Sequence, residues 1–267
     1  MIDLKHGDCL ELMQSIPNNS VDMILCDLPY GTTACEWDKV IPFEPLWEQY
    51  KRITKENAAI VLFSAMPFTV NLVASNRKMF RYEWIWQKTN KTGFLNANKM
   101  PLKIHENILI FYERLPVYNP QFGRGKPYVK REHGYSAVYG EVGRAATIND
   151  GRRYPVDIIT YNSVSSSRNK LKLGTGKPVD LLEYLVKTYT NEGETVLDNC
   201  MGSGSTGVAC VNTNRNFIGY ELSEKHYNYA VDRIKQALER QTAGSPQLLR
   251  GDMATPQTPT RRRKSGS

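Results

Sequence analysis

Seven short apolar runs, rich in β-branched and aromatic residues, predict β-strands along the chain. The runs cover residues 2–5, 21–26, 58–63, 81–87, 107–112, 195–197 and 216–220. Stretches such as MILC and AIVLF are continuous in apolar residues, which is typical of parallel strands covered by helices on both faces. We therefore expect an α/β fold with a doubly wound sheet.

Helical periodicity fills several of the intervals between these runs. An apolar stripe at positions 182, 185, 186 and 189 follows Pro178, a residue that suits the first turn of a helix, and stops before Gly193. A second stripe at positions 227, 231, 234 and 238 predicts a final helix. We interpret both stripes as core-facing sides of helices.

Two segments depart from this alternation of strands and helices. Residues 115–175 combine glycine, proline, tyrosine and basic residues without a sustained period, which indicates an inserted module or a long functional loop region. Residues 242–267 have the composition of a disordered tail. The rest of the chain is long enough for one main domain.

The net charge of +8 is concentrated in the same two segments. Residues 114–175 hold eleven Lys and Arg against four Asp and Glu, and residues 250–267 hold five against one. A concentrated positive field favours a polyanionic partner such as nucleic acid. The alternative is a solvated basic loop without a partner.

The five cysteines contain no C-x-x-C pair and no neighbouring histidine cluster, so neither a disulfide framework nor a zinc site is indicated. The sequence has no apolar run of membrane-spanning length and no secretion signal at its start. We expect a soluble cytoplasmic protein.

A glycine-rich loop, TVLDNCMGSGSTGVAC, follows the sixth predicted strand. Gly202, Gly204 and Gly207 have the spacing G-x-G-x-x-G, and Glu221 ends the next strand, where it can accept from ribose hydroxyls. Asp198 stands where the phosphates of a dinucleotide would approach, but its charge suits an ammonium group such as that of S-adenosylmethionine. These residues alone leave open a structural turn, a dinucleotide site or an S-adenosylmethionine site.

The tetrapeptide Asp27-Leu28-Pro29-Tyr30 follows the second predicted strand, at the sheet edge where ligands gather in open α/β folds. The exocyclic amine of a nucleobase is a poor nucleophile because its lone pair is delocalised. A carboxylate and a fixed carbonyl that accept from this amine place negative charge where positive charge develops. Pro29 fixes that carbonyl, and Tyr30 offers a face on which an extruded base can stack. The alternative is a capped turn that closes a buried strand.

At this point the sequence resembles the amino-group DNA methyltransferases of the permuted beta class, in which the catalytic tetrapeptide precedes the recognition region and the glycine motif comes last. The resemblance covers roughly residues 2–234. It is carried by GDCLELM, DLPYG, WQK, GFLNANK, HENILIFYE, GKPVDLLEYLVKTYTNEGETVLDNCMGSGSTG and FIGYELSEKHYNYAVDRI. Two departures are Leu28 in place of the first proline, and Asn199-Cys200 in place of the usual Pro-Phe.

The resemblance implies a Rossmann-like, mostly parallel sheet of seven strands, circularly permuted so that strand 2–5 lies beside strand 216–220. Residues 1–114 would form the catalytic half, residues 115–175 the target-recognition insert, and residues 176–241 the cofactor-binding half. The catalytic half and the cofactor half would then meet although they lie at opposite ends of the chain.

The resemblance also implies roles for single residues. Asp27 and the carbonyl of Leu28, fixed by Pro29, would hold the target amine while Tyr30 stacks on the flipped base. The implied cofactor-binding residues are Asp198, Gly202 and Gly204 for the methionine part, Glu221 for the ribose, Asp8 and Cys9 for the adenine, and Lys177 near the carboxylate. Asp8 as an acid that merely ends a strand, and Lys177 as a solvated lysine, are the alternatives.

The implied activity is transfer of a methyl group from S-adenosyl-L-methionine to adenine N6 in double-stranded DNA, because family members that act on cytosine N4 more often have serine in place of Asp27. No metal, membrane or covalent enzyme intermediate is expected, and a homodimer is compatible with the sequence. The resemblance also implies a role in restriction-modification. Candidate DNA contacts in the insert are Arg124, Lys126, Lys130, Arg131, Arg152 and Arg153. Alternatives are an N4-cytosine or RNA methyltransferase and an inactive DNA-binding protein.

Overall fold

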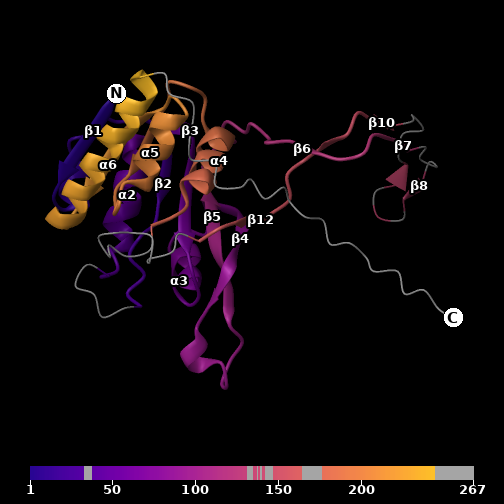
Figure 1. The fold of residues 1–267 in the computed structure, drawn as a ribbon, viewed down its shortest axis with the longest axis horizontal. Helices are drawn as coiled ribbons and strands as arrows, with labels where there is room; N and C mark the ends of the chain where they lie inside the picture. Colours follow the sequence, from indigo (N-terminus) through magenta and orange to yellow (C-terminus); the bar gives the residue numbers. More distant parts are fainter. Residues whose placement is uncertain are drawn as a thin grey trace. The chain divides into compact units, whose positions relative to one another are not determined.

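The structure is a computed structural model, and it describes residues 1–32, 38–130, 135–136, 138, 140–141, 147–163 and 176–243. These residues belong to two compact units (Figure 1). The larger unit contains residues 1–118 together with the chain from Asp157 onward, and the smaller unit contains Asn119–Val156. Most of the predicted tail, from residue 244, and Arg131 of the insert lie outside the described residues.

A mixed sheet of eight strands is the centre of the larger unit. In spatial order its strands are β1 (Ile2–His6), β14 (Asn216–Glu221), β13 (Thr195–Asp198), β2 (Val21–Cys26), β3 (Thr54–Ser64), β5 (Lys103–Phe111), β4 (Phe80–Thr92) and β12 (Ile158–Tyr161). All neighbours are parallel except at β5, which runs antiparallel to both β3 and β4. The predicted α/β fold with a mostly parallel sheet is confirmed.

The permuted connectivity is also confirmed by the strand register. β1 pairs in parallel with β14, with Leu4 opposite Gly219, so the first strand of the chain lies beside the last. β13 pairs in parallel with β2, with Leu197 opposite Ile24. The strand that precedes Asp27 is therefore the direct neighbour of the strand that precedes the glycine loop.

The sheet has eight strands where seven were predicted. The additional strand, β12, lies within the segment 115–175 that we assigned to the insert, and it pairs in parallel with β4, with Ile159 opposite Trp86. Its four residues are too short to predict from periodicity, and their partner lies about seventy residues earlier in the sequence. The smaller unit is accordingly shorter than the predicted insert.

Helices cover both faces of the sheet (Figure 1). They are α1 (Cys9–Met13), α2 (Phe43–Ile53), α3 (Phe68–Ser75), α4 (Val179–Tyr189), α5 (Ser205–Asn212) and α6 (Glu224–Thr242). Met23 and Leu25 of β2 pack in one core with α4, α5 and α6, whereas Ile24 and Cys26 pack in a second core with α1, α2 and α3. Burial on both faces explains why the strands are continuous in apolar residues, since neither face meets water. The described part of the chain contains no helix with the length and apolar character needed to cross a membrane.

The antiparallel pair β4 and β5 extends beyond the rest of the sheet as a two-stranded ribbon. A short 3-10 helix, η1 (Phe94–Asn96), lies at its tip. Strand β3 accompanies β5 only as far as Asn107, and β12 accompanies β4 only as far as Lys88. In Figure 1 the ribbon points away from the sheet.

The smaller unit consists of short antiparallel strand pairs. They are β6 (Gly123–Arg124) with β11 (Arg152–Arg153), β7 (Tyr128–Lys130) with β10 (Thr147–Asn149), and β8 (Tyr135–Ser136) with β9 (Gly140–Glu141). Two-stranded ribbons of this kind bury little apolar area. Ile148 is 80% exposed and Tyr154 is 74% exposed, so large apolar side chains of the unit face solvent.

Candidate active site

Four acidic residues that the sequence singled out lie at one edge of the sheet, at the carboxyl ends of neighbouring strands. Asp8 follows β1, Glu221 ends β14, Asp198 ends β13 and Asp27 follows β2. Because these strands are parallel neighbours, residues more than two hundred positions apart come together. In open α/β sheets this edge is where ligands bind.

Asp27 is held by two side chains. Its Oδ1 accepts a hydrogen bond of 2.7 Å from the hydroxyl of Tyr30, and its Oδ2 accepts from Nζ of Lys177, which precedes α4. The Asp27 side chain is 35% exposed, whereas that of Lys177 is 11% exposed. The carboxylate is therefore fixed from the protein side while part of it stays accessible.

Lys177 connects Asp27 to a second carboxylate, Glu106 of β5, which the sequence did not indicate. Nζ of Lys177 lies 3.4 Å from Oε2 of Glu106, and Lys88 of β4 pairs with Oε1. Burial lowers the pKa of Lys177, but Asp27 and Glu106 outweigh it and raise this pKa above its usual value. Burial alone would raise the pKa of the Glu106 carboxyl group, but the charges of Lys177 and Lys88 outweigh burial and lower this pKa below its usual value. These four residues, Asp27, Lys177, Glu106 and Lys88, form what we call the charge relay cluster, with two positive and two negative groups.

Tyr30 stacks on Phe68 of α3, with ring centroids 5.1 Å apart and an interplanar angle of 27°. Burial, followed by the charge of Asp27, raises the pKa of Tyr30 well above its usual value. The phenol therefore stays protonated and donates to Asp27. One face of the ring therefore packs against Phe68, and Nζ of Lys177 lies 5.9 Å from the ring centroid.

The chain after Tyr30 is anchored by Asp38, another residue that sequence analysis missed. Its two carboxylate oxygens accept from the backbone N–H groups of Gly31 and Thr32, each at 2.9 Å. Asp38 is 6% exposed. Since an aspartate eight positions after the tetrapeptide has no special sequence signature, this turn could be found only in the structure.

Asp198 is buried at the end of β13. Its Oδ2 accepts a hydrogen bond of 2.6 Å from Thr206 of α5, and its Oδ1 accepts one of 3.1 Å from the backbone N–H of Cys200. Burial raises the pKa of Asp198 to about 7, against the opposing effect of these hydrogen bonds. The charge of this carboxyl group therefore changes near neutral pH.

Asn199 and Cys200, where the sequence departs from the family pattern, also lie in this region. Asn199 is 1% exposed, and its Oδ1 accepts a hydrogen bond of 2.6 Å from the hydroxyl of Tyr50 on α2. Its Nδ2 lies 3.6 Å from Sγ of Cys9. Where the family usually has a proline, Asn199 therefore forms polar contacts that connect the end of β13 with α1 and α2.

The glycines of the loop have two different environments. Gly202 has a φ of +52°, and a Cβ at this position would meet no atom closer than 4.0 Å, so its backbone borders open space. Gly204 has a φ of +72°, and a Cβ there would lie 2.9 Å from Cβ of Ala230 on α6. Gly202 can let a ligand approach the backbone, whereas Gly204 allows α5 and α6 to pack closely.

Glu221 binds the backbone of the same loop. Its Oε2 accepts from the N–H of Gly202 at 2.9 Å, and its Oε1 accepts from the N–H of Ser223 at 2.8 Å. Each carboxylate oxygen has a second lone pair for a ligand hydroxyl. Glu221 is 8% exposed, so a ligand would reach it only at a mostly covered position.

The remaining predicted cofactor residues lie beside this loop. Oδ1 of Asp8 caps α1 by accepting from the N–H groups of Leu10 at 2.8 Å and Glu11 at 3.3 Å. Cys9 is buried at the start of the same helix. Asp8 is therefore the N-cap residue of α1.

The predicted DNA contacts that the structure describes belong to the smaller unit. Arg124, Lys126 and Lys130 are exposed. Arg152 lies 3.2 Å from Asp150, and Arg153 donates to Asn149 and to the carbonyl of Lys126, so the hairpin itself engages both guanidinium groups. Arg152 is nevertheless 59% exposed, like the exposed Arg124, Lys126 and Lys130, whereas Arg153 is partly buried.

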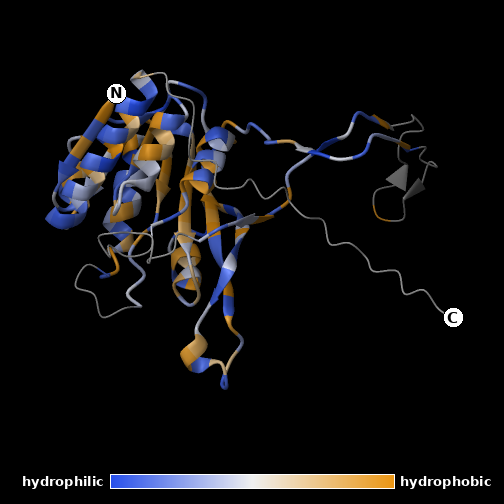
Figure 2. Cartoon of the chain, viewed as in Figure 1, coloured by the Kyte–Doolittle hydropathy of each residue, from blue (hydrophilic) through white to orange (hydrophobic). Residues whose placement is uncertain are grey.

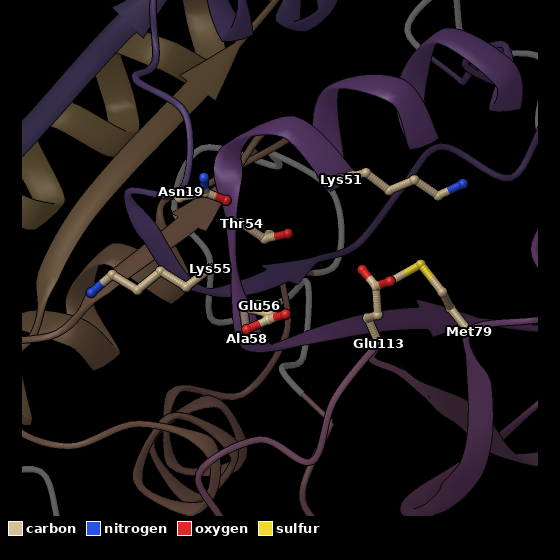
Figure 3. Close-up of a pocket in the computed structure, with 8 residues that line it drawn as sticks. All are labelled: Asn19, Lys51, Thr54, Lys55, Glu56, Ala58, Met79 and Glu113. Carbon is tan, nitrogen blue, oxygen red and sulfur yellow. The ribbon is translucent and has the colours of Figure 1, made fainter.

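A separate cavity of about 420 Å³ lies at the opposite edge of the sheet, near the start of β3 (Figure 3). Its lining residues are Asn19, Lys51, Thr54, Lys55, Glu56, Ala58, Met79 and Glu113. In Figure 3 the side chains of Lys51 and Lys55 extend in opposite directions. Ligand sites have polar groups that converge, so this cavity does not resemble one.

Among the described residues, no group of three or more His, Cys, Asp or Glu side chains could hold a metal ion.

Comparison with known proteins identifies the family. A family model described as DNA methylase, for N6 and N4 methyltransferases, matches residues 21–232, which is most of the chain. The chain belongs to this family of DNA amino-methyltransferases.

Individual relatives agree with this assignment. The chain is 24% identical over 241 residues to the type II methyltransferase M.HpaI of Haemophilus parainfluenzae, covering 85% of this chain and 72% of the relative. Two solved structures share its fold. The M1.HpyAVI–SAM complex has a TM-score of 0.58 at 22% identity, covering 87% of this chain and 98% of the other. The cytosine-N4-specific PvuII DNA methyltransferase has a TM-score of 0.64 at 14% identity, covering 91% and 93%.

Proposed function

We propose that the protein transfers the methyl group of S-adenosyl-L-methionine to the N6 amine of an adenine flipped out of double-stranded DNA. The observation that carries the proposal is the position of the Asp27 carboxylate. It is oriented by Tyr30 and Lys177, partly exposed, and located at the end of a strand adjacent to the one that ends in Asp198. Adenine is favoured over cytosine because aspartate, rather than serine, begins the tetrapeptide.

The chemistry requires the amine lone pair to leave conjugation with the ring. Asp27, oriented from the protein side, accepts one N–H of the target amine, and the carbonyl of Leu28 accepts the other, so that negative charge faces the nitrogen as it becomes positive. The Leu28 side chain is buried at 3% exposure, which holds its backbone in place. The face of Tyr30 opposite Phe68 supports the base, and the stacking on Phe68 keeps the ring from rotating.

The cofactor proposal is supported by the donor set at the glycine loop. S-adenosyl-L-methionine supplies an electrophilic methyl group on a sulfonium when it is bound. The carboxylate of Asp198 suits its ammonium group, the open backbone at Gly202 leaves room for the methionine part, and Glu221 has lone pairs for the ribose hydroxyls. Burial raises the pKa of Cys26 to about 12, which fits a direct transfer without a thiolate nucleophile.

For the smaller unit we propose target recognition, with Arg124, Lys126 and Lys130 as contacts to phosphate or base edges. The support is its exposed basic strands and its exposed apolar side chains. Arg131 belongs to the same proposal through its sequence position alone. Arg152 and Arg153 would act mainly by holding the hairpin that presents the other three.

The test is incubation with labelled S-adenosyl-L-methionine and duplex DNA, followed by mass spectrometry of the nucleosides. N6-methyladenine is the expected product. N4-methylcytosine would show that the protein belongs to the other branch of the family. Label in RNA alone would show that RNA is the substrate, and absence of label from both nucleic acids would leave only a DNA-binding role.

Asp27→Ala should abolish transfer and retain cofactor binding, because the residue contacts the amine and not the cofactor. A variant with normal transfer would contradict this role for Asp27.

A further inference from the structure

The free end of the β4–β5 ribbon, residues 89–105, is a distinct structural feature that the proposed active site does not use. We call it the β4–β5 arm. It lies beyond the last register pairs of β3 and β12 with these strands, so within the described residues its strands form strand pairs only with each other. Asn90 of the arm also lies 3.4 Å from the hydroxyl of Ser163. The tip is nevertheless folded, since the N–H of Asn96 donates to the carbonyl of Gly93 at 3.0 Å and the N–H of Met100 to that of Asn96 at 3.0 Å.

The arm exposes large apolar side chains at its tip. Phe94 is 67% exposed, Leu95 is 100% exposed and Met100 is 52% exposed. Figure 2 shows a hydrophobic tip at the end of a largely hydrophilic ribbon. Leaving a leucine side chain in water forgoes about 1.5–3 kcal/mol of burial free energy. A folded tip that keeps these groups outward therefore indicates a partner that covers them.

The charge of the arm identifies the chemistry of that partner. No acidic residue occurs between Glu83 and Glu106, whereas the arm contains Lys91, Lys99 and Lys103. Lys91, Lys99 and Lys103 are exposed. An apolar tip flanked only by cations is complementary to a polyanion with an apolar interior surface, and duplex DNA with its stacked bases has this combination.

The origin of the arm places it at the active-site edge of the sheet. β4 runs parallel to β2 and β3, so the end of β4 and the start of β5 lie at the edge where Asp27 follows β2. Lys88 and Glu106 of the charge relay cluster flank the base of the arm, and Glu106 is linked to Asp27 through Lys177. A substrate whose amine reaches Asp27 therefore extends past the base of the arm.

We propose that the β4–β5 arm is a second DNA-contacting element of the enzyme, separate from the insert. Its lysines contact phosphates, and its tip at Phe94 and Leu95 enters a groove of the duplex beside the flipped base. This inference rests on the proposed function. With a rise of about 3.3 Å per residue the arm reaches roughly 20 Å from Lys88 to its tip. A two-stranded ribbon fits the major groove of B-DNA, and inserted apolar side chains can hold a step open where a base has left the stack.

The charge of the arm is tested with the double variant Lys91→Gln/Lys99→Gln. The matched control is Lys225→Gln/Lys235→Gln, which removes two exposed lysines from α6. Affinity for a labelled duplex that the wild type methylates is measured over a range of salt concentrations. We expect the arm variant to bind more weakly and to lose about two units from the slope of log K against log salt, at about 0.9 per phosphate contact. The control should keep the slope of the wild type.

The apolar tip is tested with Phe94→Ser/Leu95→Ser, against Leu115→Ser as a control for removing an exposed leucine at the opposite edge of the sheet. We expect about tenfold weaker DNA binding at fixed salt, within the range for loss of one good DNA contact. The thermal midpoint and the affinity for S-adenosyl-L-methionine should not change, because the substituted side chains are exposed.

The outcomes separate this inference from the proposed function. If the wild type methylates DNA and both arm variants bind and methylate it with wild-type constants, the arm proposal is overturned and the proposed function stands. If the wild type forms a dimer that Phe94→Ser/Leu95→Ser dissociates without changing DNA affinity, the tip is an interface between copies, and the proposal is again overturned. If the wild type transfers no methyl group to DNA, the proposed function itself fails.

Discussion

The strongest test of the charge relay cluster is the substitution Glu106→Gln, which removes one negative charge while keeping the shape of the side chain. Glu106 and Lys177 are 15% and 11% exposed, so their interaction is only partly screened by water. At an effective dielectric constant of about 20, unit charges 3.4 Å apart attract by about 5 kcal/mol before desolvation is counted. The loss in unfolding free energy should be smaller, about 2–3 kcal/mol, because Lys177 keeps Asp27 as a partner.

The same substitution should slow methyl transfer. With Glu106 neutral, the cluster changes from balanced charge to a net positive charge beside the amine, where positive charge develops in the transition state. Lys177 also pairs with Asp27 alone, which weakens the carboxylate as an acceptor. We expect kcat to fall by roughly tenfold to a hundredfold, equivalent to about 1.4–2.7 kcal/mol in the barrier, with little change in cofactor affinity.

The assay combines chemical denaturation with single-turnover transfer of labelled methyl groups. Glu56→Gln is the control, since its ion pair with Arg114 is 59% and 70% exposed and should contribute less than about 1 kcal/mol. The pKa of Glu106 is lowered in the folded protein, so its stabilisation is present above the unfolded-state pKa of about 4.3 and disappears as the pH falls through the folded-state pKa. The stability difference between wild type and Glu106→Gln should therefore shrink in acid. A Glu106→Gln enzyme with wild-type kcat and stability would refute the reasoning.

Three further predictions concern Asp198, Asn199 and Gly204 at the end of β13 and in the glycine loop. The pKa of Asp198 is raised to about 7, so the folded state retains a proton that the unfolded chain has released, and this residue costs stability as the pH rises from about 4 to about 7. In thermal scans, the midpoint of Asp198→Asn relative to that of the wild type should rise over this pH range. The affinity for S-adenosyl-L-methionine, measured by calorimetry, should increase with pH in the wild type only. Tyr50→Phe leaves the Asn199 carboxamide oxygen without its buried donor and should lower the unfolding free energy by about 1–3 kcal/mol in urea titrations, and an unchanged midpoint would exclude a role for this bond. Gly204→Ala forces a Cβ to 2.9 Å from Ala230 and strains a left-handed φ, so it should cost at least about 1–3 kcal/mol and weaken cofactor binding, and full stability would contradict the packing role.

The sequence predicted those parts of the fold and the site that depend on local pattern. Continuous apolar runs identified the strands because both faces of the sheet are covered. Asp27, Asp198 and Glu221 were found because each follows or ends a strand, and parallel strands bring such positions to one edge. Local residue order was sufficient for these inferences.

Interactions that depend on distant partners could not be predicted. Glu106 lies inside an apolar strand, and only its contact with Lys177, seventy-one positions later, gives it significance. The pair of Tyr50 and Asn199 joins residues 149 positions apart. The use of Arg153 in holding its own hairpin likewise depends on a turn that has no regular period.

The orientation of β5 has a mechanical consequence for this enzyme. In a wholly parallel sheet, every strand leaves the ligand-binding edge through a connection that crosses back over a face, and no strand pair can project outward. One reversed strand lets the polypeptide turn around beyond that edge, so a stiff two-stranded lever is joined directly to Glu106, one of the two carboxylates that pair with Lys177. Force applied to this lever would reach Glu106 through two paired strands rather than through a loop, and it would pass from there to Asp27 through Lys177.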